Sequence, residues 1–341
     1  MVANVGSGDQ GEGLLSCTIT MVTLVEARPA KSRRSSPNHN CPSGCVPHTR
    51  AKRGMEMITD AATMPILSAR RKQLQDEGYC ILKGVADDEL LSRTQACVNN
   101  AIAAQVPSQS KKNQSPGLML AAEHYPELSG IIGNPVVSQA LGQIGLSGSA
   151  FWKAVIISKP PAGPRLYWHQ DCLMWDDPRS YSQISPMVFL MYYMEDTTGE
   201  NGCLRVLPGT HRKRHILHQM GEAHTPEVND MKNPDDPRFL NYAGEKDVPM
   251  CAGDAVIGDA RMFHATHENQ SNERRTVITI WYHPLFGGLQ PSTQSWIHKQ
   301  FYERHGHWPK SALAEISAVI PRYDGDVPPM KYNRFPDERL T

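Results

Sequence analysis

Hydrophobic and polar positions divide the 341-residue chain into two parts near residue 62. Residues 1–62 are rich in Gly, Ser, Pro and Arg, and their apolar positions follow neither a helical nor a strand period. We therefore predict a disordered N-terminal extension over residues 1–62 and one folded domain over residues 63–341. The extension has no continuous apolar stretch after a basic start, which argues against a secretory signal. Its Arg- and Ser-rich, acid-poor composition from Met21 onward is similar to that of a transit peptide, and a true start at Met55, Met57 or Met64 is an equally good explanation.

Helical periods dominate the first part of the predicted domain. The pattern predicts a helix that ends at Gly78, a short strand over residues 79–85 and a second helix over residues 87–105. The second helix opens on two acidic residues, which suit the positive end of a helix dipole. Two further short helical patterns, broken by a Gly and a Pro, lie within residues 123–145.

Short apolar runs separated by turn residues replace the helical pattern after residue 148. We predict strands within residues 150–159, 165–170, 186–194, 203–209, 254–259 and 275–283. Asn201-Gly202, between two of these runs, is typical of a tight hairpin. Helices followed by many short strands indicate an α+β domain whose β part is a sandwich or a barrel.

The charge balance excludes two classes of partner. Lys plus Arg and Asp plus Glu each number 35, so the formal net charge is zero and no overall attraction to nucleic acid or anionic membrane is expected. The longest apolar run, residues 187–194, is less than half of the roughly 20 residues that cross a bilayer. We expect a small-molecule substrate, no nucleic acid and no membrane; the sequence leaves the oligomeric state open.

The eight cysteines do not form the framework of a disulfide scaffold in a chain of this length. Without a secretory signal, free thiols in a reducing compartment are favoured. We expect an intracellular protein, with the cytoplasm favoured over mitochondria and peroxisomes. Cys41 and Cys45, in a C-x3-C pair, are an alternative zinc site, but the spacing is loose and no second pair exists.

One aromatic-rich stretch, YWHQDCLMW over residues 167–175, contains two groups that are costly to bury unpaired. His169 and Asp171 are two positions apart, so at the end of a strand their side chains can converge on one point. His264, which precedes a polar turn and a strand, is the strongest candidate for a third ligand. Two histidines and one carboxylate form the facial ligand set of non-haem Fe(II) oxygenases.

An arginine that follows His264 in the sequence is a candidate for binding the carboxylate of a cosubstrate. Arg275 lies 11 residues after His264, which we interpret as across one hairpin. One carboxylate leaves an Fe(II) site net positive, which suits an anionic chelating cosubstrate. The planar guanidinium of Arg matches a carboxylate with two parallel hydrogen bonds, so it can bind the far end of such a molecule.

The motifs HQD, NGCLRVLPGTH and GDA…H…N.S…RR resemble the phytanoyl-CoA dioxygenase (PhyH) family of Fe(II)/2-oxoglutarate oxygenases over roughly residues 63–285. The resemblance implies a double-stranded β-helix (a jelly-roll or cupin-like barrel) with flanking helices. It implies Fe(II) as cofactor, with 2-oxoglutarate and O2 as cosubstrates that are converted to succinate and CO2 while a C–H bond is oxidised. The family's roles fall on metal ligands His169, Asp171 and His264, on Arg275 for the 2-oxoglutarate carboxylate, and on Thr266 and Gln170 as cosubstrate contacts.

Two of these assignments have close competitors in the sequence. His267 is three residues from His264, but Asn269 and Arg275 fit the family spacing only from His264. Arg274 is next to Arg275, and strand alternation sends the two side chains to opposite faces. The spacing favours His264 and Arg275.

Several other residues admit both a structural and a functional interpretation. His211 is favoured as a hydrogen-bonded turn residue, and the basic run over residues 211–218 as a solvated face, with anion binding as the alternative. Lys153 is a further candidate for contact with the cosubstrate. Core or pocket wall are the two interpretations for Trp152, Trp168, Met174 and Trp175.

The sequence therefore favours an Fe(II)/2-oxoglutarate-dependent dioxygenase that hydroxylates a small organic substrate such as an acyl-CoA, an acid or a secondary metabolite. Asp171 argues against a halogenase, because a small residue there would be needed to open a halide position. A non-catalytic barrel that binds a metal or ligand is one alternative. A metal-dependent hydrolase is another, but it gives Arg275 no function.

Overall fold

The computed structural model describes residues 63–105 and 115–341. The predicted disordered extension over residues 1–62 and the alternative zinc pair, Cys41 and Cys45, lie outside the described residues. The division of the chain into an extension and a domain therefore stays a prediction.

The helices begin and end close to the predicted positions in the first part of the domain. Gly78 ends α1 with a φ of +90°, and the Asp87 side chain caps α2 by accepting a hydrogen bond from Leu90 N at 2.8 Å. Two helices after residue 290 were not predicted. The α-helices are α1 (Thr63–Glu77), α2 (Asp88–Ala103), α3 (Ser129–Ile132), α4 (Pro135–Gln143), α5 (Pro226–Asn229), α6 (Pro291–His305) and α7 (Lys310–Glu315).

The strands of the described ranges form two sheets in which every paired neighbour is antiparallel. The larger sheet has the order β1-β8-β5-β10-β3-β2, with β1 (Tyr79–Leu82), β8 (Ala255–Asp259), β5 (Val188–Tyr193), β10 (Arg275–His283), β3 (Ala150–Lys159) and β2 (Leu118–Ala121). The smaller sheet has the order β4-β9-β6-β7, with β4 (Leu166–His169), β9 (His264–Thr266), β6 (Leu204–Val206) and β7 (Lys246–Val248).

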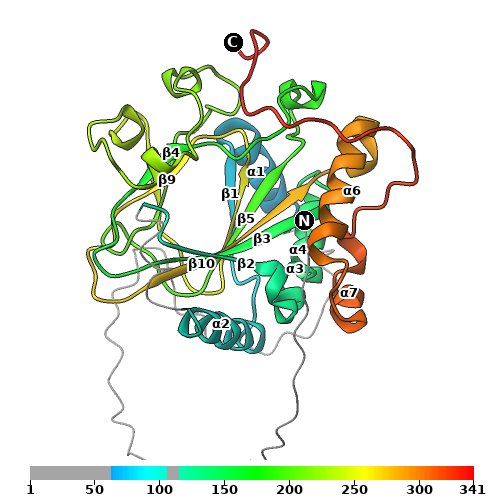
Figure 1. Ribbon diagram of the computed structural model, residues 1–341, viewed down its shortest axis with the longest axis horizontal. Coiled ribbons are helices and arrows are strands. Elements are labelled where there is room, and N and C mark those ends of the chain that lie inside the picture. Colours follow the sequence, from blue (N-terminus) through cyan, green and yellow to red (C-terminus); the bar gives the residue numbers. More distant parts are fainter. Residues whose placement is uncertain (1–62, 106–114) are drawn as a thin grey trace, which may run out of the picture. The chain divides into compact units, whose positions relative to one another are not determined.

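The two faces of the larger sheet have different partners. Alternate residues such as Phe151, Ile156 and Ile280 pack in one buried cluster with residues of α1, α2, α4 and α6. The residues between them, such as Val155 and Trp281, pack toward the smaller sheet in a second cluster. Figure 1 shows α1, α2 and α6 beside the larger sheet and β4 and β9 on its other side. Two facing antiparallel sheets with helices on one outer face confirm the predicted double-stranded β-helix.

Two predicted hairpins are wrong. Asn201-Gly202 does form a turn, with a φ of +90° at Gly202, but β5 before it and β6 after it belong to different sheets. The chain between His264 and Arg275 likewise crosses from β9 in the smaller sheet to β10 in the larger one. In a double-stranded β-helix the chain alternates between sheets, so a turn sequence does not identify the strands that pair.

The thiols partly follow the prediction. Cys80, Cys97, Cys172 and Cys203 are free, whereas Cys251 is disulfide-bonded, contrary to the expectation of free thiols throughout. In the part of the chain that the structure describes, no helix has both the length and the apolar character needed to span a bilayer.

Candidate metal centre

Two histidines face each other across the short strands β4 and β9. His169, the last residue of β4, lies opposite His264, the first residue of β9, and their ring centroids are 4.1 Å apart. Residues directly opposite in an antiparallel pair carry their side chains on the same face of the sheet. Strand pairing therefore brings together two side chains that are far apart in the sequence.

Each histidine is held through its Nδ1 atom. His169 Nδ1 lies 3.0 Å from Tyr167 O, and His264 Nδ1 lies 3.2 Å from Met262 O. A carbonyl can only accept a hydrogen bond, so Nδ1 donates on both rings and the Nε2 lone pair is available to a metal. The Nε2 atoms lie 3.8 Å (His169) and 3.7 Å (His264) from carboxylate oxygens of Asp171.

Asp171 completes the group from the segment that follows β4. Trp281 Nε1 on β10 donates a hydrogen bond to Asp171 Oδ2 at 2.8 Å. Burial by itself raises the pKa of Asp171, but the nearby His264 and His169 and the bond from Trp281 outweigh it and lower that pKa to about 2. Burial, followed by the proximity of His264, holds the pKa of His169 well below its usual value. An ionised carboxylate and a neutral imidazole are the forms that bind a metal.

The predicted ligands fit a transition metal. The ligand atoms of His169, Asp171 and His264 all lie within 4.8 Å of one another, and all three side chains are buried. Two imidazole nitrogens and one carboxylate oxygen are the facial donor set of non-haem Fe(II) sites, in which other coordination positions stay open.

A cavity of about 320 Å³ opens next to this group. Its volume lies near the lower end of the range of about 300–1,000 Å³ that is typical of small-molecule sites. The cavity is bounded by residues of both sheets, and its apolar wall includes Trp152, Ile157, Leu173, Met187, Met191 and Val277.

Arg275 and Thr266 line the same cavity. The Arg275 side chain is buried, its Nε has no hydrogen-bond partner among the described residues, and burial lowers its pKa. A buried guanidinium without a paired carboxylate is costly, so an anion that enters the cavity gains a strong partner. Lys159 Nζ donates to Thr266 Oγ1 at 2.8 Å, which leaves the Thr266 hydroxyl hydrogen available to a ligand.

Gln170 does not join this group. Its Nε2 donates to Arg334 O at 2.5 Å and its Oε1 accepts from Trp175 Nε1 at 3.2 Å. These bonds tie the segment after β4 to the C-terminal segment, and Gln170 is not among the residues that line the cavity. The structure thus separates Gln170 from Arg275 and Thr266, with which the sequence had grouped it.

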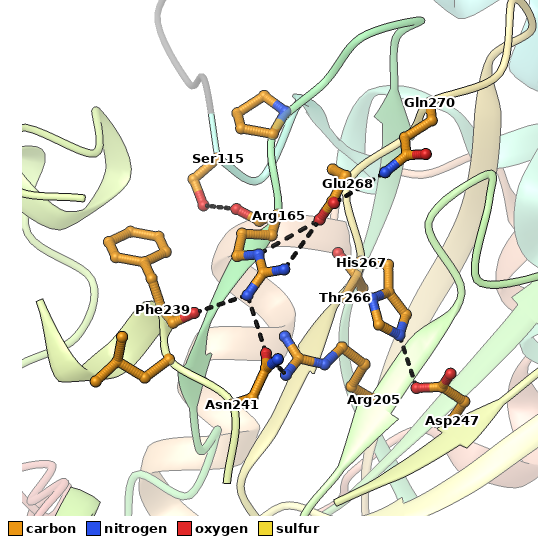
Figure 2. A network of polar contacts seen from close by, with 12 residues as sticks. Ser115, Arg165, Arg205, Phe239, Asn241, Asp247, Thr266, His267, Glu268 and Gln270 are labelled. Carbon is orange, nitrogen blue, oxygen red and sulfur yellow. Dashed lines mark hydrogen bonds and ion pairs between the residues drawn. The ribbon is translucent and has the colours of Figure 1, made fainter. Parts of the chain in front are cut away.

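The competing residues lie elsewhere. His267 Nε2 is 2.7 Å from Asp247 Oδ1, and Figure 2 shows this pair directed away from Thr266. Cys203 joins His267 and Asp247 in a second group of ligand atoms within 4.8 Å of one another, but Asp247 is exposed and already bonded. Arg274 is exposed and donates to Ser158 Oγ at 3.3 Å, so strand alternation separates it from Arg275 as expected.

The remaining sequence candidates have structural partners. His211 Nε2 lies 3.0 Å from Gln75 O, as expected for a hydrogen-bonded turn histidine. Within the basic run, Arg214 Nε donates to Leu340 O at 3.0 Å, so this arginine holds the C-terminal segment. Of the four large apolar residues, Trp152 lines the cavity, whereas Trp168, Met174 and Trp175 are buried elsewhere.

Six polar side chains of the cavity were missed by sequence reasoning: Tyr167, Tyr193, His224, Asn229, Thr279 and Arg334. The Tyr167 hydroxyl donates to Asn229 Oδ1 at 2.7 Å and lies 3.0 Å from His224 Nδ1, and burial lowers the pKa of His224 to about 4. Arg334 reaches the cavity from the C-terminal segment, with its Nε 3.2 Å from Glu222 Oε1. Alternation along the predicted strands could have identified Tyr167, whereas Asn229, His224 and Arg334 lie in irregular segments without a periodic signal.

The fold and the site together define a double-stranded β-helix protein with a candidate facial metal centre. The sequence model described as "Phytanoyl-CoA dioxygenase (PhyH)" matches residues 74–277, which is more than half of the chain. The chain therefore belongs to the phytanoyl-CoA dioxygenase family.

Solved structures show the same fold. SnoN, described as a non-heme alpha ketoglutarate dependent epimerase from nogalamycin biosynthesis, is 18% identical over 66% of this chain and 84% of its own, with a TM-score of 0.50. EctD from S. alaskensis, described with bound Fe, is 16% identical over 69% of this chain and 82% of its own, also with a TM-score of 0.50. No curated protein matches the sequence.

Proposed function

We propose that the chain is an Fe(II)- and 2-oxoglutarate-dependent dioxygenase that hydroxylates a C–H bond of a small organic substrate, with release of succinate and CO2. One observation carries the proposal. The three candidate ligands share a cavity with Arg275, a buried cation that forms no salt bridge among the described residues. Membership of the phytanoyl-CoA dioxygenase family supports the same class of oxidation.

Each residue has a defined task in this proposal. His169 and His264 bind iron through Nε2, and Asp171 binds it through its carboxylate. The bound iron supplies the coupling of O2 reduction to the oxidative decarboxylation of 2-oxoglutarate. Arg275 and the Thr266 hydroxyl bind the far carboxylate of 2-oxoglutarate and so fix its orientation in the cavity.

The test is succinate formation from 2-oxoglutarate in the presence of Fe(II) and O2, measured with and without candidate substrates. We expect His169→Ala and Asp171→Ala to lose both succinate formation and Fe(II) binding, because each removes one of only three protein ligands. His267→Ala is the matched control. It removes a histidine that also faces a carboxylate but lies outside the cavity, so turnover should persist.

Two results would contradict the proposal. One is tight binding of Zn(II) without any heat of 2-oxoglutarate binding in calorimetry, which favours a non-catalytic barrel. The other is binding of Fe(II) and 2-oxoglutarate with no consumption of O2 by the wild-type protein over a broad substrate library.

A further inference from the structure

Strand β3 carries a lysine into the cavity, next to a β-bulge that adds Trp152 to the same wall. On β3 opposite β10, Lys153 pairs with Trp281 and Phe151 pairs with Tyr282, so Trp152 is the extra residue of the longer strand. Phe151 faces the helices, whereas Trp152 and Lys153 both line the cavity although they are consecutive. Bulges re-aim side chains in this way and are frequent next to active sites. Lys153 lies on the cavity face in regular alternation with Val155 and Ile157, and the bulge turns Trp152 to that face as well.

Lys153 has aromatic neighbours and no salt bridge among the described residues, although Asp171 is near enough to raise its pKa. Its Nζ lies 4.5 Å from the centroid of the Trp152 ring and 4.7 Å from that of Trp281, which are cation–π distances. Among the described residues no carboxylate forms a salt bridge with it and no acceptor receives a hydrogen bond from its ammonium group. An ammonium group has three donors, so the two rings leave its hydrogen-bonding capacity unused.

In the proposed complex, the positive charge of Lys153 is the one charge of the cavity lining that no anion offsets. Arg334 also lines the cavity, but Glu222 already pairs with it at 3.2 Å. In the proposed complex, Asp171 and the two charges of 2-oxoglutarate together offset those of Fe(II) and Arg275. One positive charge is left, and it belongs to Lys153.

We propose, on the basis of the function proposed above, that the substrate is a small carboxylic acid whose carboxylate is bound by Lys153 in this cavity. Leu173, Met187 and Met191 provide an apolar wall for the rest of the molecule, and methionine side chains adapt to different shapes. Trp281 contacts Lys153 through its ring and Asp171 through Nε1, so the lysine and the candidate metal ligand lie on either side of one indole contact. In this proposal a carboxylate bound by Lys153 therefore lies near the metal group.

The test compares acids with their neutral amides by calorimetry on the full chain loaded with Fe(II) and 2-oxoglutarate under nitrogen, where no turnover occurs. The probes are hexanoate and hexanamide, 4-methylpentanoate and 4-methylpentanamide, and 3-phenylpropionate and 3-phenylpropionamide. We expect at least one acid to bind tenfold or more tightly than its amide. Lys153→Met should abolish this preference, and Lys153→Arg should retain it because the charge is kept.

Controls separate the possible failures. Lys299→Met removes an exposed lysine of α6 outside the cavity and should leave the preference for the acid unchanged. Equal binding of acids and amides, binding of no acid, or an unchanged preference in Lys153→Met would each overturn the proposal. A weaker affinity for 2-oxoglutarate in Lys153→Met, without a change for the acids, would assign Lys153 to the cosubstrate instead and overturn it as well. Loss of Fe(II) and 2-oxoglutarate binding in the wild-type protein would instead refute the proposed function itself.

Discussion

The two sheets contribute different chemistry to one cavity. The smaller sheet, with strands of three or four residues, carries His169 and His264 at facing strand ends. The larger sheet, whose longest strands β10 and β3 have nine and ten residues, carries Arg275 and Lys153. The smaller sheet thus presents neutral metal ligands, and the larger sheet presents the cations for anionic ligands.

The two sheets are also stabilised differently. The larger sheet packs against helices through an apolar cluster. The smaller sheet relies in part on the polar network in Figure 2, where Arg205 on β6 donates to Asn241, and Arg165 donates to Asn241 and Glu268. Arg205 also donates to Glu245. Short strands bury little apolar surface of their own, and we expect these ionic contacts to add to the apolar packing that holds the metal ligands.

If the larger sheet supplies the cations for anionic ligands, the largest expected effect is the loss of 2-oxoglutarate affinity when Arg275 is replaced. Arg275→Met removes the charge that faces the cavity, and loss of a buried partner for a carboxylate costs about 3 kcal/mol, or roughly 100-fold in the dissociation constant of 2-oxoglutarate. Affinity for Fe(II) alone should stay the same, because the ligands belong to the other sheet. Calorimetry measures both affinities. Arg274→Met, one residue earlier and exposed, is the control; an equal effect of both variants would contradict the assigned role.

A second variant tests the smaller sheet. Arg205→Ala removes a fully buried guanidinium and leaves Glu245 without its partner at 2.6 Å. Loss of a fully buried ion pair costs about 3–5 kcal/mol, and because Glu245 is partly exposed we expect the free energy of unfolding to fall by about 2–3 kcal/mol. Arg165→Ala, whose partner Glu268 is also partly exposed, should cost less than about 1 kcal/mol.

Urea denaturation measures these losses, and metal titration measures their effect on the site. Arg205→Ala should weaken Fe(II) binding, because β6 pairs with β9, which carries His264. An unchanged Fe(II) affinity in a clearly destabilised Arg205→Ala protein would show that the polar network does not order the ligands.

Trp281 links the two sheets, because it belongs to β10 of the larger sheet and donates a hydrogen bond to the candidate metal ligand Asp171. Trp281→Phe keeps an aromatic ring and loses the hydrogen bond to Asp171 Oδ2. Removal of a group that orients a metal ligand commonly costs about 10–100-fold in metal affinity, and we expect the lower end of this range for Fe(II). Trp296→Phe, on α6 outside the cavity, is the control. No change in metal titration of Trp281→Phe would show that the strand ends alone orient Asp171.

The sequence predicted those parts of the site that depend on local patterns. The long strands over residues 150–159 and 275–283 were predicted with their bounds, because nine or ten residues of β-branched and aromatic character give a clear signal. His169, Asp171 and His264 were found because H-x-D and a distal histidine have a fixed relation to iron chemistry.

The missed features depend on contacts between distant segments. The strand of His264 has three residues, too few for any period, and its pairing with the strand of His169 is set by the tertiary fold. Arg334 enters the cavity from the C-terminal segment, which follows no motif of the family. The bulge at Trp152 depends on the register with β10, so strand alternation alone cannot place the Trp152 ring beside Lys153.

The smallest expected effect is a pH dependence that isolates Lys153 from the other cations. Burial lowers the pKa of Lys153 to about 8, whereas the guanidinium of Arg275 stays protonated throughout the accessible range. Lys153 binds a carboxylate as a cation, so affinity for an acid probe should be nearly full at about pH 7 and should fall by at most about tenfold between pH 7 and pH 9. The matching amide should bind equally across this range, and Lys153→Arg should remove the dependence for the acid. If wild type and Lys153→Arg show the same decline in calorimetry, another group titrates, and the charge on the larger sheet that selects the substrate is not Lys153.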